Sequence, residues 1–159
     1  MSSATPGTVF DCNVFLQALL NDRGPAYGCM ELVDSGQVTL LASPEVLAEI
    51  KDVLNRPKLQ QKFLALTPER VAAFLQDIEG KAVLYTSVPK VITLERGPKD
   101  EPYLNLAVTA GARYLVTRDK DLLDLMRMEN PEGKDLRQRF PQLTILEPGA
   151  FLKEFSSKS

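Results

Sequence analysis

One stretch decides the fold: Lys99-Asp-Glu-Pro-Tyr-Leu-Asn-Leu-Ala-Val-Thr-Ala-Gly-Ala-Arg-Tyr-Leu-Val-Thr-Arg-Asp-Lys-Asp121. It begins as an amphipathic helix, because Leu104, Ala107 and Val108 fall at i, i+3 and i+4. Asp100 suits the N-cap of this helix, and a proline two residues later suits its first turn. Gly111 suits the left-handed residue that ends such a helix.

The second half of the stretch predicts a short buried strand, which is followed by an acid. The apolar run Tyr114-Leu-Val-Thr117 is the strand, and Asp119 comes directly after its end. In open α/β sheets, ligands bind at the carboxyl ends of parallel strands. Asp119 therefore lies where chemistry is expected, and Asp100 lies one helix away from it.

The rest of the chain repeats this alternation of short apolar runs and amphipathic segments, which is typical of a parallel sheet covered on both faces. We expect one domain over residues 1–159 with a three-layer α/β/α sandwich, a central, mostly parallel five-stranded sheet, and loose termini at 1–7 and 156–159. The predicted strands lie near 8–11, 38–42, 82–85, 113–117 and 143–146. Three segments predict no regular structure: a basic connection at 56–62, an extended connection at 87–97 and an exposed loop at 127–141.

Composition excludes several classes of function. The chain of 159 residues contains no histidine, which rules out a histidine general base and histidine metal ligands. Its net charge of −2 gives no bulk attraction for nucleic acid, so such a partner requires a local basic patch or a metal. Cys12 and Cys29 show no metal-ligand spacing and predict free thiols in a reducing, cytoplasmic compartment. No secretory signal or membrane span is predicted.

Four acids are candidates for one site. Asp11 and Asp119 each follow a predicted strand, Asp100 stands at a helix start, and Glu49 falls on the apolar side of the helix that begins after Ser43. Each acid also has a purely structural interpretation, as a cap, a turn residue or a solvated group. If the four converge, a like-charged pair at about 4 Å costs about 4 kcal/mol at an effective dielectric of about 20. A divalent cation relieves that repulsion, and carboxylate oxygens suit Mg²⁺ or Mn²⁺.

Four blocks of sequence, in order, resemble the PIN domains, which are metal-dependent ribonucleases. The resemblance is closest to the toxins of toxin–antitoxin pairs and spans about residues 8–153. The blocks are Phe10-Asp-Cys-Asn-Val-Phe15, Ser43-Pro-Glu-Val-Leu-Ala-Glu-Ile50 with Val53-Leu-Asn-Arg-Pro-Lys58, Lys99-Asp-Glu-Pro-Tyr-Leu-Asn-Leu-Ala107, and Tyr114-Leu-Val-Thr-Arg-Asp-Lys-Asp-Leu-Leu123. The segment Ile145–Leu152 resembles the usual closing segment of that branch.

The resemblance implies a catalytic set and its supports. The acidic site maps to Asp11, Glu49, Asp100 and Asp119, with Mg²⁺ or Mn²⁺ held by Asp11, Asp100 and Asp119. The supporting residues would be Asn13, Thr117 and Asp121. Glu101 is a second candidate beside Asp100, although the helix start favours Asp100. Basic residues near these acids predict contacts to RNA phosphates, namely Arg56, Lys58, Arg118 and Lys120.

These features predict a metal-dependent endoribonuclease, the toxin of a toxin–antitoxin pair, with an antitoxin or a second copy of the chain as protein partner. Two alternatives stay open. A catalytically silent PIN-like module would only bind a partner. A phosphohydrolase of haloacid-dehalogenase type also begins with an aspartate after the first strand, but it needs a second aspartate where this chain has Asn13.

Overall fold

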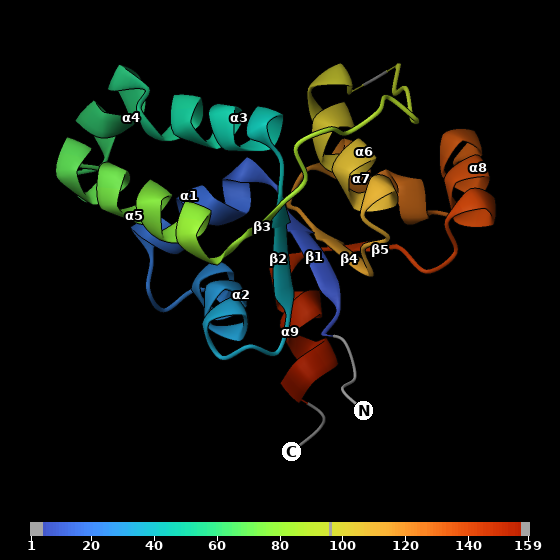
Figure 1. Cartoon of the computed structure of the whole chain (residues 1–159), viewed down its shortest axis with the longest axis horizontal. Helices are drawn as coiled ribbons and strands as arrows, with labels where there is room; N and C mark the ends of the chain where they lie inside the picture. The colour runs from blue at the N-terminus through green and yellow to red at the C-terminus, as the bar shows by residue number, and fades with distance from the viewer. Residues whose placement is uncertain (1–4, 96, 157–159) are drawn as a thin grey trace.

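The computed structural model describes residues 5–95 and 97–156 and is built around a five-stranded parallel sheet (Figure 1). The strands lie in the order β3-β2-β1-β4-β5, so the first strand of the chain is central. Their bounds are β1 Gly7–Phe10, β2 Thr39–Ala42, β3 Val83–Leu84, β4 Tyr114–Val116 and β5 Thr144–Leu146. All five predicted strands are confirmed. β3 is a short strand at the edge of the sheet, and both of its residues are exposed.

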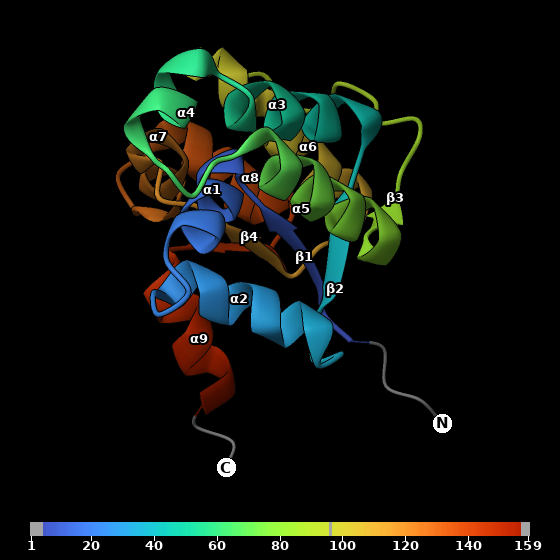
Figure 2. The ribbon, with the colours of Figure 1, turned by 90° about the vertical axis from the view of Figure 1, so that its left-hand side faces the viewer.

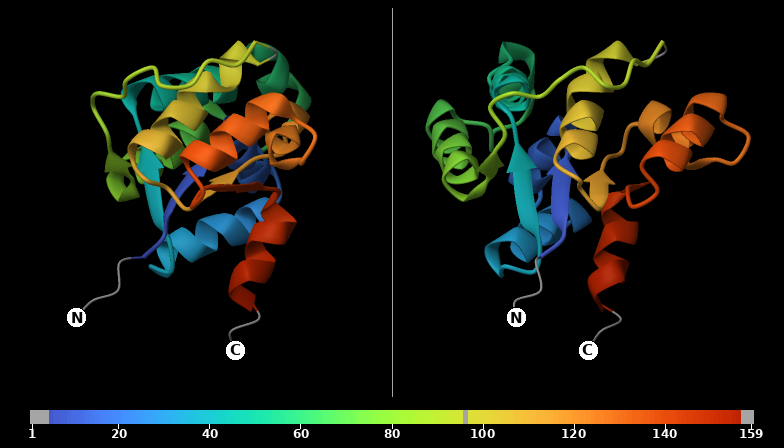
Figure 3. Two further views of the ribbon diagram at one scale, coloured as in Figure 1. Left: turned by 90° about the vertical axis from the view of Figure 1, so that its right-hand side faces the viewer. Right: turned by 45° about the vertical axis from the view of Figure 1, so that its right-hand side comes forward.

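Helices cover both faces of the sheet, which confirms the predicted α/β/α fold. One face carries α1, α2 and α9, and α6 covers the other with α7 and α8 beside it (Figures 2 and 3). The helix bounds are α1 Cys12–Leu20, α2 Pro25–Asp34, α3 Pro44–Leu54, α4 Pro57–Lys62, α5 Pro68–Lys81, α6 Glu101–Thr109, α7 Lys120–Leu123, α8 Pro131–Arg139 and α9 Pro148–Ser156. Short 3₁₀ turns occupy Pro98–Asp100 and Asp124–Met126.

Aromatic side chains fasten the outer helices to the sheet. The ring of Phe10 in β1 meets Phe15 of α1 at 5.8 Å and Phe151 of α9 at 6.0 Å, both edge to face. Tyr114 in β4 is the register partner of Thr8, so it lies on the same face of the sheet as Phe10, and its ring meets that of Phe151 at 5.1 Å. Such pairs contribute about 0.5–1.5 kcal/mol each beyond burial. The contact between Phe10 and Phe15 packs α1 against β1, and Asp11 links these two elements.

Side-chain capping holds the starts of α3 and α5, but it does not hold the start of α6. Ser43 accepts a hydrogen bond from the Val46 N–H at 3.2 Å, and Thr67 accepts one from the Arg70 N–H at 3.1 Å. Asp100 stands at the N-cap of α6, as predicted, but its side chain makes no capping hydrogen bond. The carboxylate of Asp100 is therefore not used in holding the helix end.

Two segments predicted to lack regular structure are helical. Residues 57–62 form α4, and most of the predicted loop at 127–141 is α8, so both predictions were wrong. The start of α8 is fixed by Asn130, whose side chain accepts a hydrogen bond from the Gly133 N–H at 2.8 Å. A Cβ at Gly133 would lie 2.0 Å from the Leu125 carbonyl oxygen, so this close approach requires glycine. Only Leu136 gives α8 a buried apolar anchor, which is why periodicity did not reveal it.

The extended connection before α6 is held by polar side chains of that helix. Asn105 accepts hydrogen bonds from the Val91 and Ile92 N–H groups, at 2.8 and 2.7 Å. Glu101 accepts one from the Leu94 N–H at 2.8 Å and pairs with Lys90 at 3.3 Å. This connection brings Gly97 and the start of α6 to the carboxyl edge of the sheet.

The prediction of loose termini at 1–7 and 156–159 can be compared with the structure only in part. Residues 1–4 and 157–159 lie outside the described residues, while Gly7 and Ser156 already belong to β1 and α9. Among the helices described here, none combines the length and the apolar character required to cross a membrane.

Candidate functional site

Three aspartates meet at the carboxyl edge of the central strands. Asp11 links β1 to α1, Asp119 lies between β4 and α7, and Asp100 precedes α6. Because β1 and β4 are parallel neighbours, the first two acids emerge at the same edge. One carboxylate oxygen from each of the three lies within 4.8 Å of the others. A separation of this size allows all three carboxylates to face one small cation.

The Thr117 hydroxyl forms hydrogen bonds with both Asp11 and Asp119. It donates to Asp11 Oδ2 at 2.7 Å and accepts a hydrogen bond from the Asp119 N–H at 2.9 Å. Asp119 in turn caps α7 by accepting from the Asp121 N–H at 2.8 Å. The hydroxyl is fully buried, so these bonds hold the backbone after β4 in one arrangement.

The electrostatics of the cluster are unfavourable without a cation. Burial raises the pKa of Asp11, and the Asp119 charge adds to this effect. Burial, followed by repulsion from Asp119 and Asp11, raises the pKa of Asp100 to about 7. These shifts mean that the protein alone does not compensate the negative charges of Asp11 and Asp100.

Glu49 lines the same cavity but does not belong to the three-aspartate cluster. It is half-buried on α3, and its Oε1 accepts a hydrogen bond from the Tyr103 hydroxyl of α6. The predicted inward side of α3 therefore meets a polar partner as well as the apolar core. Glu49 is placed beside the aspartates and held by a second helix.

A cavity of about 380 Å³ opens above these acids. It is lined by Asp11, Cys12, Asn13, Glu49, Val53, Arg56, Gly97, Pro98, Lys99, Asp100, Asp119 and Asp121. Of the four basic residues predicted to contact RNA, only Arg56 lines this cavity, where it also pairs with Asp52 at 3.2 Å. Lys58, Arg118 and Lys120 lie outside the lining, and Thr117 lies beneath it.

The structure also brings in residues that sequence reasoning missed. Lys99 lines the cavity directly before Asp100, a position in the sequence that could have identified it. Tyr103 lies three residues after Asp100, but the sequence carries no signal of its partner on α3. Glu101, the second candidate for the site, points elsewhere: Leu94 N–H and Lys90 lower its pKa, so it stays ionised as a structural anchor.

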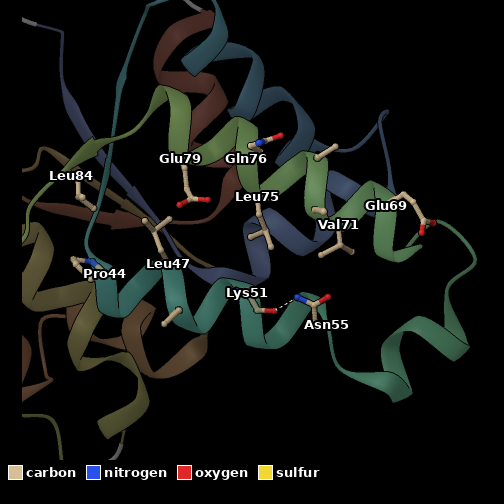
Figure 4. A pocket seen from close by; sticks show the side chains of 13 residues that line it. Pro44, Leu47, Lys51, Asn55, Glu69, Val71, Leu75, Gln76, Glu79 and Leu84 are labelled. Atoms are coloured by element: carbon tan, nitrogen blue, oxygen red, sulfur yellow. Dashed lines mark hydrogen bonds between the residues drawn. The ribbon is translucent and has the colours of Figure 1, made fainter.

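A larger groove of about 1000 Å³ lies between α3 and α5 (Figure 4). Leu47 and Leu75 face each other across it, and Leu84 of β3 lies at one end. Its two carboxylates, Glu69 and Glu79, do not form a group of acids close enough to share a metal. Within the described residues, the aspartate cluster is the group of side chains with that geometry.

Comparisons of sequence and of fold identify proteins that are similar to this chain. The sequence profile of the PIN domain family matches residues 7–121, a range that includes all three aspartates and Glu49. The chain is 29% identical, over 92% of its length and 90% of the relative's, to the uncharacterized protein MJ1680 of Methanocaldococcus jannaschii. Its fold is similar to a chain in the crystal structure of VapBC2 from Rickettsia felis bound to a DNA fragment from their promoter. That match has a TM-score of 0.53 and 16% identity, and it covers 89% of this chain and 98% of the other.

Proposed function

Because this chain belongs to the PIN domain family, we propose that it is a metal-dependent endoribonuclease that hydrolyses RNA phosphodiester bonds. The observation that carries the proposal is the meeting of Asp11, Asp100 and Asp119, whose oxygens lie within 4.8 Å of one another. None of the three is fully occupied by a structural task. Asp11 and Asp100 cap no helix with their side chains, and Asp119 uses one oxygen for α7.

The donor set fits a hard divalent cation. Three carboxylates and no histidine favour Mg²⁺ or Mn²⁺ over softer metals. The raised pKa values of Asp11 and Asp100 express a shortage of positive charge that such an ion would relieve. The three aspartates would hold the ion, which would supply charge to stabilise a phosphoryl transition state and lower the pKa of bound water.

The remaining groups have distinct tasks in the proposed reaction. Lys99 and Arg56 line the cavity and would hold the phosphate through charge-assisted hydrogen bonds. Glu49 would accept a proton from the attacking water, whose oxygen bonds to phosphorus while the bond from phosphorus to the leaving ribose oxygen breaks. The leaving oxygen takes a proton from solvent, which balances the step. Asn13 and Asp121 line the cavity and would orient water, with Thr117 as a support beneath.

We also propose that the chain acts in the cytoplasm as the toxin of a toxin–antitoxin pair. Support comes from the similar fold within the VapBC2 complex and from two cysteines that form no disulfide with each other. The protein partner would be an antitoxin or a second copy of the chain. Co-expression with a neighbouring small reading frame, followed by mass measurement of the purified complex, tests this. A monomer at micromolar concentration would contradict the homodimer.

The decisive assay combines purified protein, end-labelled single-stranded RNA and a series of metals. We expect cleavage with Mg²⁺ or Mn²⁺ and none in EDTA. Asp11→Asn and Asp119→Asn should each reduce the rate by about a hundredfold or more, because each removes one ligand charge while keeping shape. Glu101→Gln is the matched control, since it changes an acid adjacent to the site that anchors Leu94 instead.

Cleavage that survives in EDTA or in the Asp119→Asn protein would contradict the proposal. A wild-type protein that binds Mg²⁺ or Mn²⁺ but cleaves no RNA would favour the silent binding module.

A further inference from the structure

Tyr103 is a deeply buried side chain whose hydroxyl contacts Glu49 in the lining of the acidic cavity. Only 1% of its surface is exposed, yet its hydroxyl donates a hydrogen bond to Glu49 Oε1. The ring belongs to α6, one turn after Asp100, and the acid belongs to α3. The bond thus joins the helix that supplies a cluster aspartate to the helix that supplies Glu49.

The hydroxyl is not needed to fill space. Phenylalanine would occupy the same buried volume, whereas a buried hydroxyl requires a hydrogen-bond partner. Burial raises the pKa of Tyr103, and the nearby Cys12 and Glu49 add to the effect, so the phenol keeps its proton. It is therefore a permanent donor to a carboxylate. One oxygen of Glu49 is engaged, and the other is left for a water molecule.

The geometry also separates Glu49 from the aspartates. The three aspartate oxygens lie within 4.8 Å of one another, and Glu49 is not part of that group although it lines the same cavity. A flexible glutamate without an anchor could turn toward a bound cation and become a ligand. The hydrogen bond from the Tyr103 hydroxyl fixes the Glu49 carboxylate in a position separate from the three aspartates.

We propose that Tyr103 is a positioning residue for the hydrolysis, holding the Glu49 carboxylate where it accepts the proton of the attacking water and away from the metal. This inference rests on the proposed ribonuclease function. It assigns no contact between Tyr103 and substrate or metal, since the tyrosine acts only through Glu49.

The test compares two tyrosines, each of which donates to a glutamate. Tyr103→Phe removes the bond to Glu49, and Tyr114→Phe removes a bond of 3.3 Å to Glu154 at the opposite end of β4. With labelled RNA and saturating Mn²⁺, Tyr103→Phe should lower kcat about tenfold or more and change KM less than about twofold. Tyr114→Phe should leave both constants unchanged. The rise in Tm that Mn²⁺ produces should be the same in both variants and in the wild type.

A double-mutant cycle separates positioning from a structural effect. In a Glu49→Gln background, Tyr103→Phe should change kcat less than about twofold, because the group through which it acts is already disabled. Glu49→Asp shortens the acid beyond reach of the hydroxyl but keeps its charge, and it should also lower kcat. This variant keeps the idea testable even if Tyr103→Phe folds poorly.

The outcomes are distinct. Full kcat in Tyr103→Phe or Glu49→Asp overturns the inference, as does an equal loss in both Glu49 backgrounds. A diminished Mn²⁺ shift in Tyr103→Phe overturns it too, because the tyrosine would then support the metal site itself. Absence of cleavage by the wild-type protein would refute the proposed function, and this inference with it.

Discussion

Replacing Asp100 with asparagine should stabilise the metal-free protein at neutral and alkaline pH. The pKa of Asp100 is raised from 3.8 to about 7, so the folded protein binds this proton more tightly than the unfolded chain. Stability from that proton is complete below pH 3.8 and is lost as the pH rises through about 7. At pH 8 the wild-type protein therefore carries an unfavourable charge that Asp100→Asn removes.

The size of the gain in stability follows from the raised pKa of Asp100. About three pKa units at 1.36 kcal/mol each set a ceiling of about 4 kcal/mol. Since water reaches the cavity, we expect a gain of about 2 kcal/mol, which is about 4–8 °C in Tm for a domain of this size. Saturating Mg²⁺ should reverse the order: at a hundred times its Kd, a ligand stabilises the wild type by about 2.7 kcal/mol. The variant, lacking one ligand charge, should gain much less.

Thermal melts at pH 5 and pH 8, each with EDTA and with Mg²⁺, measure this crossing, which is the reversal of the order of Tm between the wild type and Asp100→Asn. The difference between the two proteins in EDTA should shrink at pH 5, where Asp100 is protonated in the folded wild type. Glu101→Gln serves as the neighbouring control and should show no crossing. A variant less stable than the wild type at pH 8 in EDTA would refute the reasoning, and so would equal Mg²⁺ shifts in both proteins.

Three further predictions concern parts of the structure outside the cluster. Leu136→Ala should destabilise by about 2–4 kcal/mol in urea melts, because α8 loses its buried anchor, while a change near zero would mean that α8 is not docked. Glu101→Ala should lower stability by about 1–3 kcal/mol in the same melts by leaving the buried Leu94 N–H unpaired, yet preserve the Mg²⁺ shift in Tm; a lost shift would return Glu101 to the metal site. Burial raises the pKa of Cys29 to about 12, so a thiol reagent at pH 8 should modify it only on unfolding, and rapid labelling of the native protein would contradict this.

Most of the fold was predictable from the sequence, because it depends on local patterns. Short apolar runs marked the strands, and Ser43 marked the start of a helix. The meeting of Asp11 and Asp119 also followed from sequence, since parallel neighbouring strands end at one edge. The helix α8 escaped prediction because a single buried leucine gives no period, and its docking depends on the tertiary contact at Gly133.

The details of the site were less accessible because they depend on pairs distant in sequence. Asp100 and Glu101 are adjacent and identical in charge; the helix start favoured Asp100, but the hydrogen bond from the Leu94 N–H to Glu101 could not be read from the sequence. The bond from Tyr103 to Glu49 joins residues 54 positions apart. Proximity in sequence to an acid does not decide which basic residues line the cavity: Arg118 is next to Asp119 and lies outside the lining, whereas Lys99 is next to Asp100 and belongs to it.

The balance of charge at this edge explains why a cation is expected there and not merely tolerated. Asp11 and Asp100 stand at the N-terminal ends of α1 and α6, where helix dipoles favour negative charge by about 0.3–1 kcal/mol each. That is too little to offset the burial and repulsion that lift the pKa of Asp100 to about 7, an effect of about 4 kcal/mol at most. Thr117 adds a hydrogen bond to Asp11 but no charge. The fold therefore assembles the carboxylates without neutralising them, and the energy that a divalent cation gains by neutralising them is available for binding.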